Sequence, residues 1–368
     1  MKKLLAVLCT FTLLTTALAG CGAKKEPTEE PSTEIAEESV ADTEEQTNKD
    51  GQMRSFLTGE WVDAEEAKQR PIAVMIGNTN DAMPQYGVGQ ADILYEVPVE
   101  GGITRLMAIY GDYSGLDKIG SVRSCRHYFA YYAIEFDAIY VHYGQAIYAT
   151  ELLDSDRIDN LNGIDGTIDS LVFYRDSARK QPHNAFTSTQ GIRAGIEHKQ
   201  YDTEYAEDYA GHYKFNEDDE NEIQLSAGEG AAVVQPGYFI SNTWFEYHED
   251  EGVYYRFEYK KPHTDENTGE QLKFKNLIIQ YTTSKVLDTN RGYLDLTTIG
   301  SGTGKYITNG KAIDITWKHD KETEATKYYD ADGNEIVLNQ GKTNVCVLLD
   351  SMKDRLNIYA DAADFEAP

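Results

Sequence analysis

Short apolar runs separated by polar segments are the feature that most limits what this 368-residue chain can fold into. Between residues 71 and 198, such runs alternate with longer amphipathic stretches. We expect strands at residues 71–76, 92–97, 102–110, 137–143 and 171–174, and helices at residues 125–136 and 187–198. None of these runs approaches the roughly 20 apolar residues that span a bilayer. The order of strands and helices predicts an α/β fold for this region.

A second pattern, alternation with a period of two, dominates after about residue 225. It is clearest at residues 253–259 and 313–317, and Asn309-Gly310 and Asp332-Gly333 are strong hairpin turns. We expect the glycine-rich segment 300–305 to be a turn, because it lacks the spacing and the following helix of a phosphate loop. The sequence therefore predicts an α/β N-terminal domain over residues 55–225, followed by a mostly antiparallel β C-terminal domain over residues 226–368.

The first 20 residues have the charged, apolar and small-residue order of an export signal, with Lys2 and Lys3 before the apolar residues 4–18. Residues 18–21 (LAGC) look like a bacterial lipoprotein cleavage box, in which the Cys21 thiol receives a diacylglycerol group and becomes the first mature residue. The alternative is an ordinary secretory signal peptide in which a cysteine lies at the cleavage site by coincidence. Lipidation at Cys21 predicts a protein anchored in the membrane by its acyl chains, at the outer face of the bacterial cytoplasmic membrane.

An acidic segment follows the cysteine. Residues 22–50 contain 10 acidic and 3 basic side chains and few apolar ones, so this stretch cannot bury enough surface to fold. We expect residues 21–54 to be the lipidated cysteine and a disordered tether. The whole chain has a net charge of −28, which makes nucleic acid an unfavourable partner.

Five of the 12 arginines occur in three short polar motifs of the first domain, despite the acidity of the chain: Arg105, Arg123, Arg126, Arg175 and Arg179. Arginines at strand ends, beside the N-terminus of a helix, form a site for phosphate or carboxylate. We predict that they meet in a ligand pocket with His142 and His183 at its rim and with Asp92 and Glu100 nearby. In the alternative interpretation, the arginines pair with the chain's own acids, namely Asp92, Glu96, Glu100 and Asp137.

Other chemistry has weaker support in the sequence. No HExxH motif, Cys/His pair or calcium loop is present, so no metal and no cofactor are expected. Cys125 lies between two arginines, where a thiol can become a nucleophile, but a buried helix residue explains it as well. We expect Cys346 to be a buried free thiol, and a disulfide between Cys125 and Cys346 is the alternative.

Several motifs resemble the YerB-type family of bacterial lipoproteins. In the first domain they are residues 71–76 (PIAVMI), 90–96 (QADILYE), 100–105 (EGGITR), 119–124 (IGSVRS) and 182–184 (PHN), and in the second they are residues 300–302, 309–311, 317 and 332–335. The resemblance covers nearly all of residues 55–350. It implies an envelope location and a two-domain layout, and it supplies no reaction.

The order of strands and arginine motifs also looks like that of LytR-CpsA-Psr phosphotransferases, although their Arg-Asp-Thr segment is missing. Those enzymes transfer lipid-linked phosphopolymers to the cell wall, with arginines holding a pyrophosphate and acids binding a divalent cation, so this likeness implies Mg²⁺. Two functions follow. The first is a binding or scaffold module for a cell-wall glycan, a phosphopolymer or an envelope protein; the alternative is an enzyme acting on phosphorylated glycan.

Overall fold

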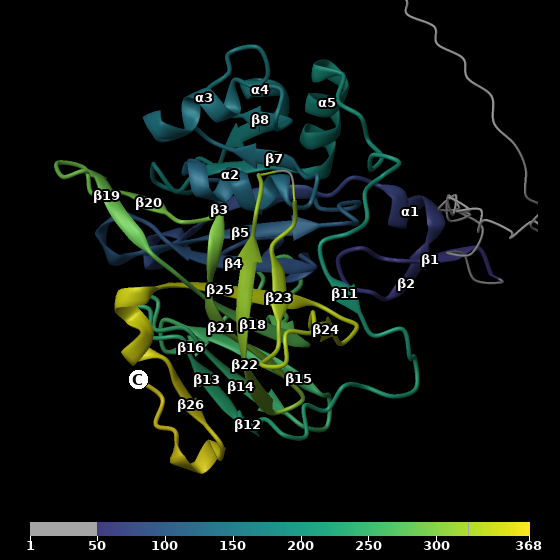
Figure 1. Cartoon of the computed structure of the whole chain (residues 1–368). Coiled ribbons are helices and arrows are strands. Elements are labelled where there is room, and N and C mark those ends of the chain that lie inside the picture. The colour runs from purple at the N-terminus through teal and green to yellow at the C-terminus, as the bar shows by residue number, and fades with distance from the viewer. Residues whose placement is uncertain (1–49, 323) are drawn as a thin grey trace, which may run out of the picture. The chain divides into compact units, whose positions relative to one another are not determined.

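The computed structural model describes residues 50–322 and 324–368, and the predicted signal peptide, Cys21 and the tether up to residue 49 lie outside this range (Figure 1). An eleven-stranded mixed sheet forms its centre, in the order β12-β22-β21-β18-β25-β4-β5-β3-β7-β8, with β23 paired to β22. These strands are β12 (Glu229–Gly230), β22 (Lys311–His319), β21 (Gly300–Thr308), β18 (Asn276–Thr282), β25 (Thr343–Leu349), β4 (Ile93–Pro98), β5 (Thr104–Tyr110), β3 (Ile72–Asn78), β7 (Ile139–His142), β8 (Asn160–Asn162) and β23 (Lys327–Tyr329).

The sheet changes character along its length. The strands β4, β5 and β3 are antiparallel neighbours, whereas β3, β7 and β8 run parallel. On the other side, β18, β21 and β22 are antiparallel, with the Asn309-Gly310 turn joining the last two. The predicted fold class, α/β followed by mostly antiparallel β, is confirmed. Because β25 lies parallel to β4, strands of both regions share one sheet, and the predicted boundary near residue 225 stays a prediction.

The central strands are buried on both faces, which explains their continuous apolar runs. All seven residues of β3 are buried. Ile72, Val74 and Ile76 belong to one apolar core, and Ala73 and Met75 to the other. Helix α5 (Thr189–Lys199) packs into the first core and helix α2 (His127–Ile134) into the second. The other helices are α1 (Ala64–Lys68), α3 (Thr150–Leu153) and α4 (Asp169–Val172).

A second sheet, of six strands, packs against the first core. Its order is β16-β15-β14-β13-β26, with β17 paired to β15. Its strands are β16 (Lys261–Pro262), β15 (Val253–Glu258), β14 (Trp244–His248), β13 (Val233–Gln235), β26 (Asn357–Tyr359) and β17 (Lys273–Phe274). The small sheets use β1 (Gln52–Arg54), β2 (Trp61–Asp63), β6 (Ile119–Gly120), β9 (Phe173–Arg175), β10 (Ala185–Thr187), β11 (Lys214–Phe215), β24 (Val337–Leu338), β19 (Ser284–Asp288) and β20 (Tyr293–Leu296).

Three local expectations need correction. Residues 52–54 are not tether but strand β1, because Met53 is buried and pairs with Val62 of β2. The segment 300–305 is not a turn but the start of β21. The expected strand at residues 171–174 is divided between the end of α4 and β9. Helix α5 begins with a side-chain cap, since the Ser188 hydroxyl accepts from the Gly191 N–H at 3.2 Å.

No helix of the described residues is both long and apolar enough to cross a membrane.

Candidate anion site at the strand ends

The ends of three strands and the start of a fourth meet at one edge of the central sheet. Arg105, the second residue of β5, lies opposite Gly77 near the end of β3 and Val97 near the end of β4. The segment that leads into α2 is attached at the same edge, because the Arg123 N–H donates to the Met75 carbonyl at 2.9 Å. Strand register and this loop therefore bring two of the predicted arginine motifs together.

Three guanidinium groups and one carboxylate lie near one another here, and we call Arg105, Arg123, Arg126 and Glu100 the arginine cluster. Arg126 forms two hydrogen bonds to Glu100, one of them from Nε at 2.9 Å. The Arg105 Nη2 atom lies 3.9 Å from Glu100, and its Nη1 donates to the Ser124 carbonyl at 2.6 Å. Arg123 donates to the Pro182 carbonyl at 2.6 Å. Among the described residues, Glu100 is the only carboxylate within ion-pair distance of these guanidinium groups.

The pKa shifts of the arginine cluster reflect burial first and the mutual repulsion of the arginines second. Burial lowers the pKa of Arg105 to about 10, and the charge of Arg126 acts in the same direction. The pKa of Arg123 is also lowered, first by burial and then by Arg126. Burial would raise the pKa of Glu100, but its hydrogen bond and charge pairing with Arg126 lower it below the usual value. Glu100 is therefore ionised and is bound mainly by Arg126. Arg105 shares this carboxylate only at 3.9 Å, and Arg123 forms no ion pair with any described residue.

The third arginine motif approaches through the loop between β9 and β10. The pKa of His183 in this loop is lowered by burial and then by the charge of Arg123, with Arg179 and Arg105 adding to the effect. The His183 Nδ1 atom and the Ser121 hydroxyl are buried and have no hydrogen-bond partner among the described residues. Arg179 is held by the carbonyls of Met83 and Pro84 at 2.9 and 2.7 Å. The loop thus adds a neutral imidazole and a further cation beside the arginine cluster.

Arg175 lies in β9 but its side chain is directed elsewhere. It is exposed, donates to the Asn184 amide oxygen at 2.8 Å and lies over the Tyr143 ring at 4.5 Å. These contacts tie it to its own hairpin and to Tyr143. Arg175 therefore does not belong to the arginine cluster.

His142 does not lie at a rim, contrary to the expectation, because it is fully buried. Its Nδ1 donates to the Gly144 carbonyl at 2.9 Å, and its Nε2 lies 3.3 Å from the Asn160 amide oxygen. Burial lowers the pKa of His142 to about 4. A neutral, hydrogen-bonded imidazole of this kind supports the end of β7 rather than contacting a ligand.

Asp92 is also separated from the arginines. It precedes β4, whereas Glu100 follows that strand, so about 20 Å of extended chain lies between them. The Asp92 carboxylate accepts from the Gly111 N–H at 2.8 Å, and burial raises its pKa to about 6. The acid that the phosphotransferase likeness would assign to a divalent cation is thus at the opposite end of the strand. No group of three or more His, Cys, Asp or Glu in the described residues is placed to hold a metal ion.

Both cysteines of the described residues are buried and free, so the alternative of a disulfide is not realised. Burial raises the pKa of the Cys125 thiol to about 12, although Arg126 and Arg105 oppose this shift. A thiol with such a pKa is protonated at neutral pH. The arrangement therefore gives no support to Cys125 as a nucleophile.

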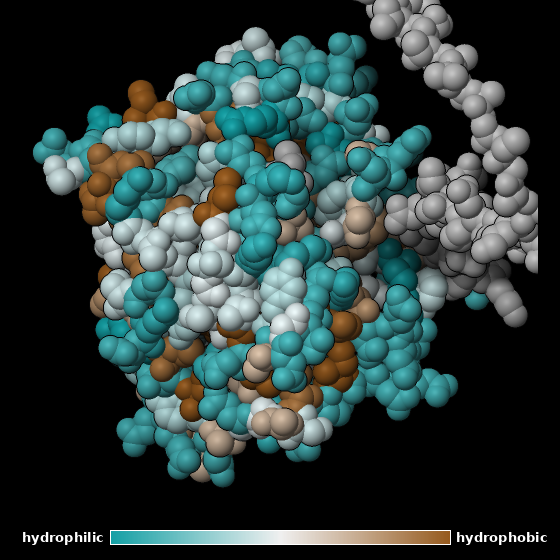
Figure 2. Space-filling model, in the orientation of Figure 1, coloured by the Kyte–Doolittle hydropathy of each residue, from teal (hydrophilic) through white to brown (hydrophobic). Residues whose placement is uncertain are grey.

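A hairpin of the second region reaches the arginine cluster, and no motif in the sequence indicated it. The Arg126 guanidinium lies 5.0 Å from the Tyr293 ring centre, and His127 Nε2 lies 2.8 Å from the Asp295 carboxylate. Both partners belong to β20. Ile147 and Val286 are exposed, and Figure 2 shows hydrophobic residues near the β19–β20 hairpin as well as in the lower half of the same face. The site is thus built from both regions of the chain.

In the alternative interpretation, the motif arginines form ion pairs with acids of the chain itself, and the structure shows such pairs for only some of these acids. Glu100 binds Arg126, but Glu96 pairs with Arg256 of β15 at 2.8 Å and Asp137 pairs with Arg70 at 3.2 Å. Arginines outside the three motifs therefore bind two of the four acids that this alternative assigns to the motif arginines.

Comparison with known proteins agrees with this architecture. The family models described as "Protein of unknown function (DUF3048) N-terminal domain" and "Protein of unknown function (DUF3048) C-terminal domain" match residues 57–202 and 234–345. The chain is 30% identical over 270 residues to "Putative lipoprotein YerB" of Bacillus subtilis (strain 168), covering 72% of this chain and 78% of that protein. The crystal structure of YerB from Bacillus subtilis matches with a TM-score of 0.73 and 27% identity, over 83% of this chain and 99% of the other. By its two consecutive domains, its fold and its sequence, the chain belongs to the YerB-type DUF3048 family.

Proposed function

We propose that this protein is a lipid-anchored binding module of the cell envelope, and that its arginine cluster binds an anionic group of a cell-wall component or an envelope protein. The observation that carries the proposal is the ratio of three guanidinium groups to one carboxylate at the edge of the sheet. Phosphate and carboxylate match the fork-shaped geometry of guanidinium and would supply the missing negative charge.

The surroundings favour a ligand held by close contacts. Arg105 is 5% exposed and Arg123 is partly buried, so an anion between them would be partly removed from water. Hydrogen bonds to charged groups are stronger in such a setting than at an exposed surface. The buried Ser121 hydroxyl and His183 Nδ1, both unpartnered among the described residues, add polar groups nearby. Because the whole chain is strongly negative, long-range attraction contributes little, and affinity should fall only moderately with salt.

Pyrophosphate is the simplest probe for this site. We expect the full mature chain, purified in detergent, to bind pyrophosphate in isothermal titration calorimetry. Arg123→Ala should weaken binding by about 1.5–3 kcal/mol, because one charge-assisted hydrogen bond is lost. The folded state of the variant is checked by circular dichroism, since Arg123 also holds the Pro182 carbonyl.

The matched control is Arg193→Ala, because Arg193 is an exposed arginine of α5 that has no ion pair among the described residues. It removes the same charge from the whole molecule but leaves the arginine cluster intact. The proposal would be contradicted if Arg123→Ala and Arg193→Ala weakened pyrophosphate binding equally, or if the unaltered protein did not bind pyrophosphate. Loss of folding in Arg123→Ala would assign the arginine a structural role instead.

The lipid anchor is proposed from the cleavage box at residues 18–21 and from the relative that is named a lipoprotein. Its location would be the outer face of the cytoplasmic membrane. Replacing Cys21 by Ala should release the protein from membranes, because no acyl chain can then be attached. Fractionation of cells that express either form measures this. Detergent-requiring membrane association that persists in Cys21→Ala would rule out the anchor.

A further inference from the structure

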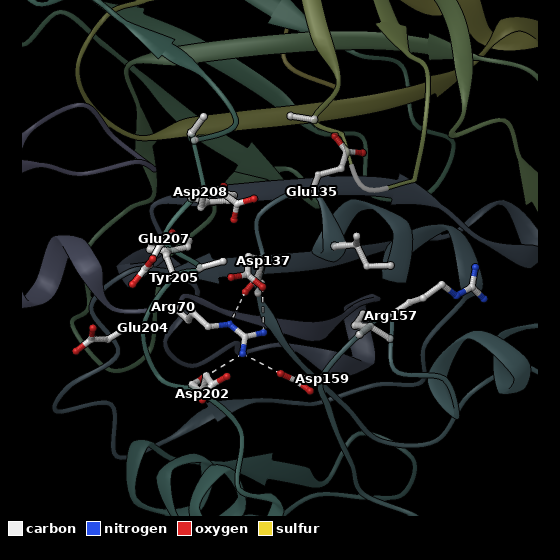
Figure 3. Close-up of a pocket in the computed structure, with 18 of the residues that line it drawn as sticks. Arg70, Glu135, Asp137, Arg157, Asp159, Asp202, Glu204, Tyr205, Glu207 and Asp208 are labelled. Atoms are coloured by element: carbon white, nitrogen blue, oxygen red, sulfur yellow. Dashed lines mark hydrogen bonds and ion pairs between the residues drawn. The ribbon is translucent and has the colours of Figure 1, made fainter. Parts of the chain in front are cut away.

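A large acidic hollow lies away from the arginine cluster, between four segments of the chain (Figure 3). Its volume is about 1050 Å³, and it is lined by Arg70 and by residues from the segments 134–138, 156–159, 202–211 and 324–327. We call it the acidic pocket. A volume of this order is enough for a ligand of several functional groups.

Carboxylates dominate its lining, with nine acidic side chains against three basic ones. The basic side chains already have partners. Arg70 pairs with Asp137 and Asp159 at 3.2 and 2.8 Å, as Figure 3 shows. Arg157 pairs with Glu322 at 2.6 Å, and Lys327 with Glu335 at 3.2 Å.

The remaining negative charge is not neutralised within the described chain. Five of the lining carboxylates form no ion pair with any described residue: Asp156, Asp202, Glu204, Glu207 and Asp208. The pKa of Asp137 is raised, first by burial and also by the charges of Asp159 and Asp202, in spite of its pairing with Arg70. The pocket therefore holds more negative charge than its own cations compensate.

A buried acceptor at one end of the acidic pocket points independently to a ligand. The Glu135 side chain lines the pocket and is fully buried, and its Oε1 atom has no hydrogen-bond partner among the described residues. His319 Nδ1 lies 3.6 Å from this atom and instead donates to the Thr298 carbonyl at 2.8 Å. A buried carboxylate oxygen without a donor is costly, and a ligand N–H would satisfy it.

Aromatic rings complete the lining. Tyr205 and Tyr209 stack at 4.4 Å with an angle of 6° between their planes, and Phe56 contacts both rings edge-on. The Tyr209 hydroxyl is buried and unpartnered within the described chain. Aromatic faces beside carboxylates suit ammonium and guanidinium groups, which are attracted by both.

We propose that the acidic pocket binds an organic cation with two or more amino or guanidino groups. The carboxylates are spread along the hollow, which suits an extended polycation rather than a single ion. In agreement, no three of the described His, Cys, Asp and Glu residues are placed to hold a metal ion. A free polyamine and a basic peptide segment of a partner protein share this chemistry, and the experiment distinguishes the two sources.

The test is calorimetric titration of the full chain in detergent at low salt, with spermine in one arm and hexalysine in the other. Glu207→Gln/Asp208→Asn should weaken binding about fivefold, as expected for the loss of two exposed ion pairs. The matched control is Glu249→Gln/Asp250→Asn, an adjacent and exposed Glu-Asp pair in the turn between β14 and β15. The control should leave the affinity unchanged.

Binding of either probe with this difference between variants supports the proposal. Tighter binding of spermine assigns the pocket to a small polyamine, and tighter binding of hexalysine assigns it to a basic peptide. Equal weakening in both double variants would show that only the net charge of the chain attracts the probes, and this would overturn the proposal. Failure of both probes to bind the unaltered chain would overturn it as well.

Discussion

At the scale of single residues, buried charge is the feature that sequence patterns describe least well. In β15 the alternation placed Val253, Tyr255 and Phe257 on one face, and the structure has this alternation. The fully buried face is the opposite one, which carries Arg256 and Glu258. Polar residues are expected to face water unless a partner is known. That partner, Glu96, is distant in the sequence, so local periodicity could not indicate which face is buried.

The buried network predicts a pH dependence of stability. Burial raises the pKa of Glu258 to about 7, although Arg256 opposes the shift. In the unfolded chain this pKa is about 4.3. Between these values the unfolded chain has lost the proton that the folded protein still holds, so the contribution of Glu258 to stability falls as the pH rises. Urea unfolding between pH 4.5 and 7.5 should show the Glu258→Gln variant gaining about 1.4 kcal/mol per pH unit relative to the unaltered protein.

The comparison between variants isolates this one group, because other buried residues titrate in the same range. His142, whose pKa is lowered to about 4 by burial, acts with the opposite sign. The control is Glu197→Gln, which alters an exposed carboxylate of α5. Its stability should stay parallel to that of the unaltered protein at every pH. If the stability of Glu258→Gln also stayed parallel to that of the unaltered protein, Glu258 would already be ionised in the folded state.

At the scale of elements, the start of β21 shows how packing overrides local signals. The glycines of segment 300–305 indicate a turn, yet they lie in a strand, with Gly302 opposite Trp317 of β22 and Gly304 opposite Ile315. A Cβ atom at Gly302 would lie 2.5 Å from Trp317 Nε1, and one at Gly304 would lie 2.1 Å from the Ile279 carbonyl oxygen. Here glycine provides room for close contacts across the sheet, and not the freedom to turn.

Gly302→Ala should therefore destabilise the protein. The new methyl group would displace the Trp317 indole, which donates to the Tyr281 carbonyl at 2.8 Å, and overpacking of this kind costs about 1–3 kcal/mol. Urea unfolding followed by tryptophan fluorescence measures both the loss of stability and the altered surroundings of Trp317.

Gly166→Ala is the matched control, because a Cβ atom there would have no neighbour within 4 Å. We expect an unchanged or slightly increased stability for it. If Gly302→Ala behaved in the same way, the close packing of Trp317 against β21 would be refuted.

At the scale of the whole molecule, the two family domains are joined in a common sheet. Strand β25 of the second region lies beside β4 of the first, and Arg256 of the second sheet binds Glu96 of β4 at 2.8 Å. Ser241 and Thr104, one from each region, donate to the same carboxylate at 3.0 and 2.8 Å. The network thus fixes both regions to each other through a buried charge.

Removing its cation should destabilise both regions together. Arg256→Met leaves Glu96 and Glu258 buried without their counter-ion, which costs about 3–5 kcal/mol. Hydrogen exchange should then become faster by a similar factor in β5 and in β18, because both belong to one cooperative sheet. Arg193→Met, at an exposed position, should change neither. Faster exchange confined to β18 would show that the two regions open independently.

The sequence by itself determined the local content of this protein: most central strands, helices α2 and α5, the hairpin at Asn309-Gly310 and the fold class. These follow from periodicity and turn residues, which act over a few positions. It also predicted that Arg105, Arg123, Arg126, Arg175 and Arg179 meet in one pocket, because each motif could be placed at a strand end. The side chain of Arg175 is instead bound to Asn184 and lies over Tyr143.

Only the tertiary structure decided the rest. In the folded protein, Asp92 lies at the end of β4 opposite to the arginine cluster, and His142 is buried. Glu96 forms its ion pair with Arg256, and Tyr293 contacts Arg126. Each of these depends on which strands become neighbours in the sheet. Strand pairing between distant segments is decided by the packing of whole faces, and the residues of one segment alone cannot show it.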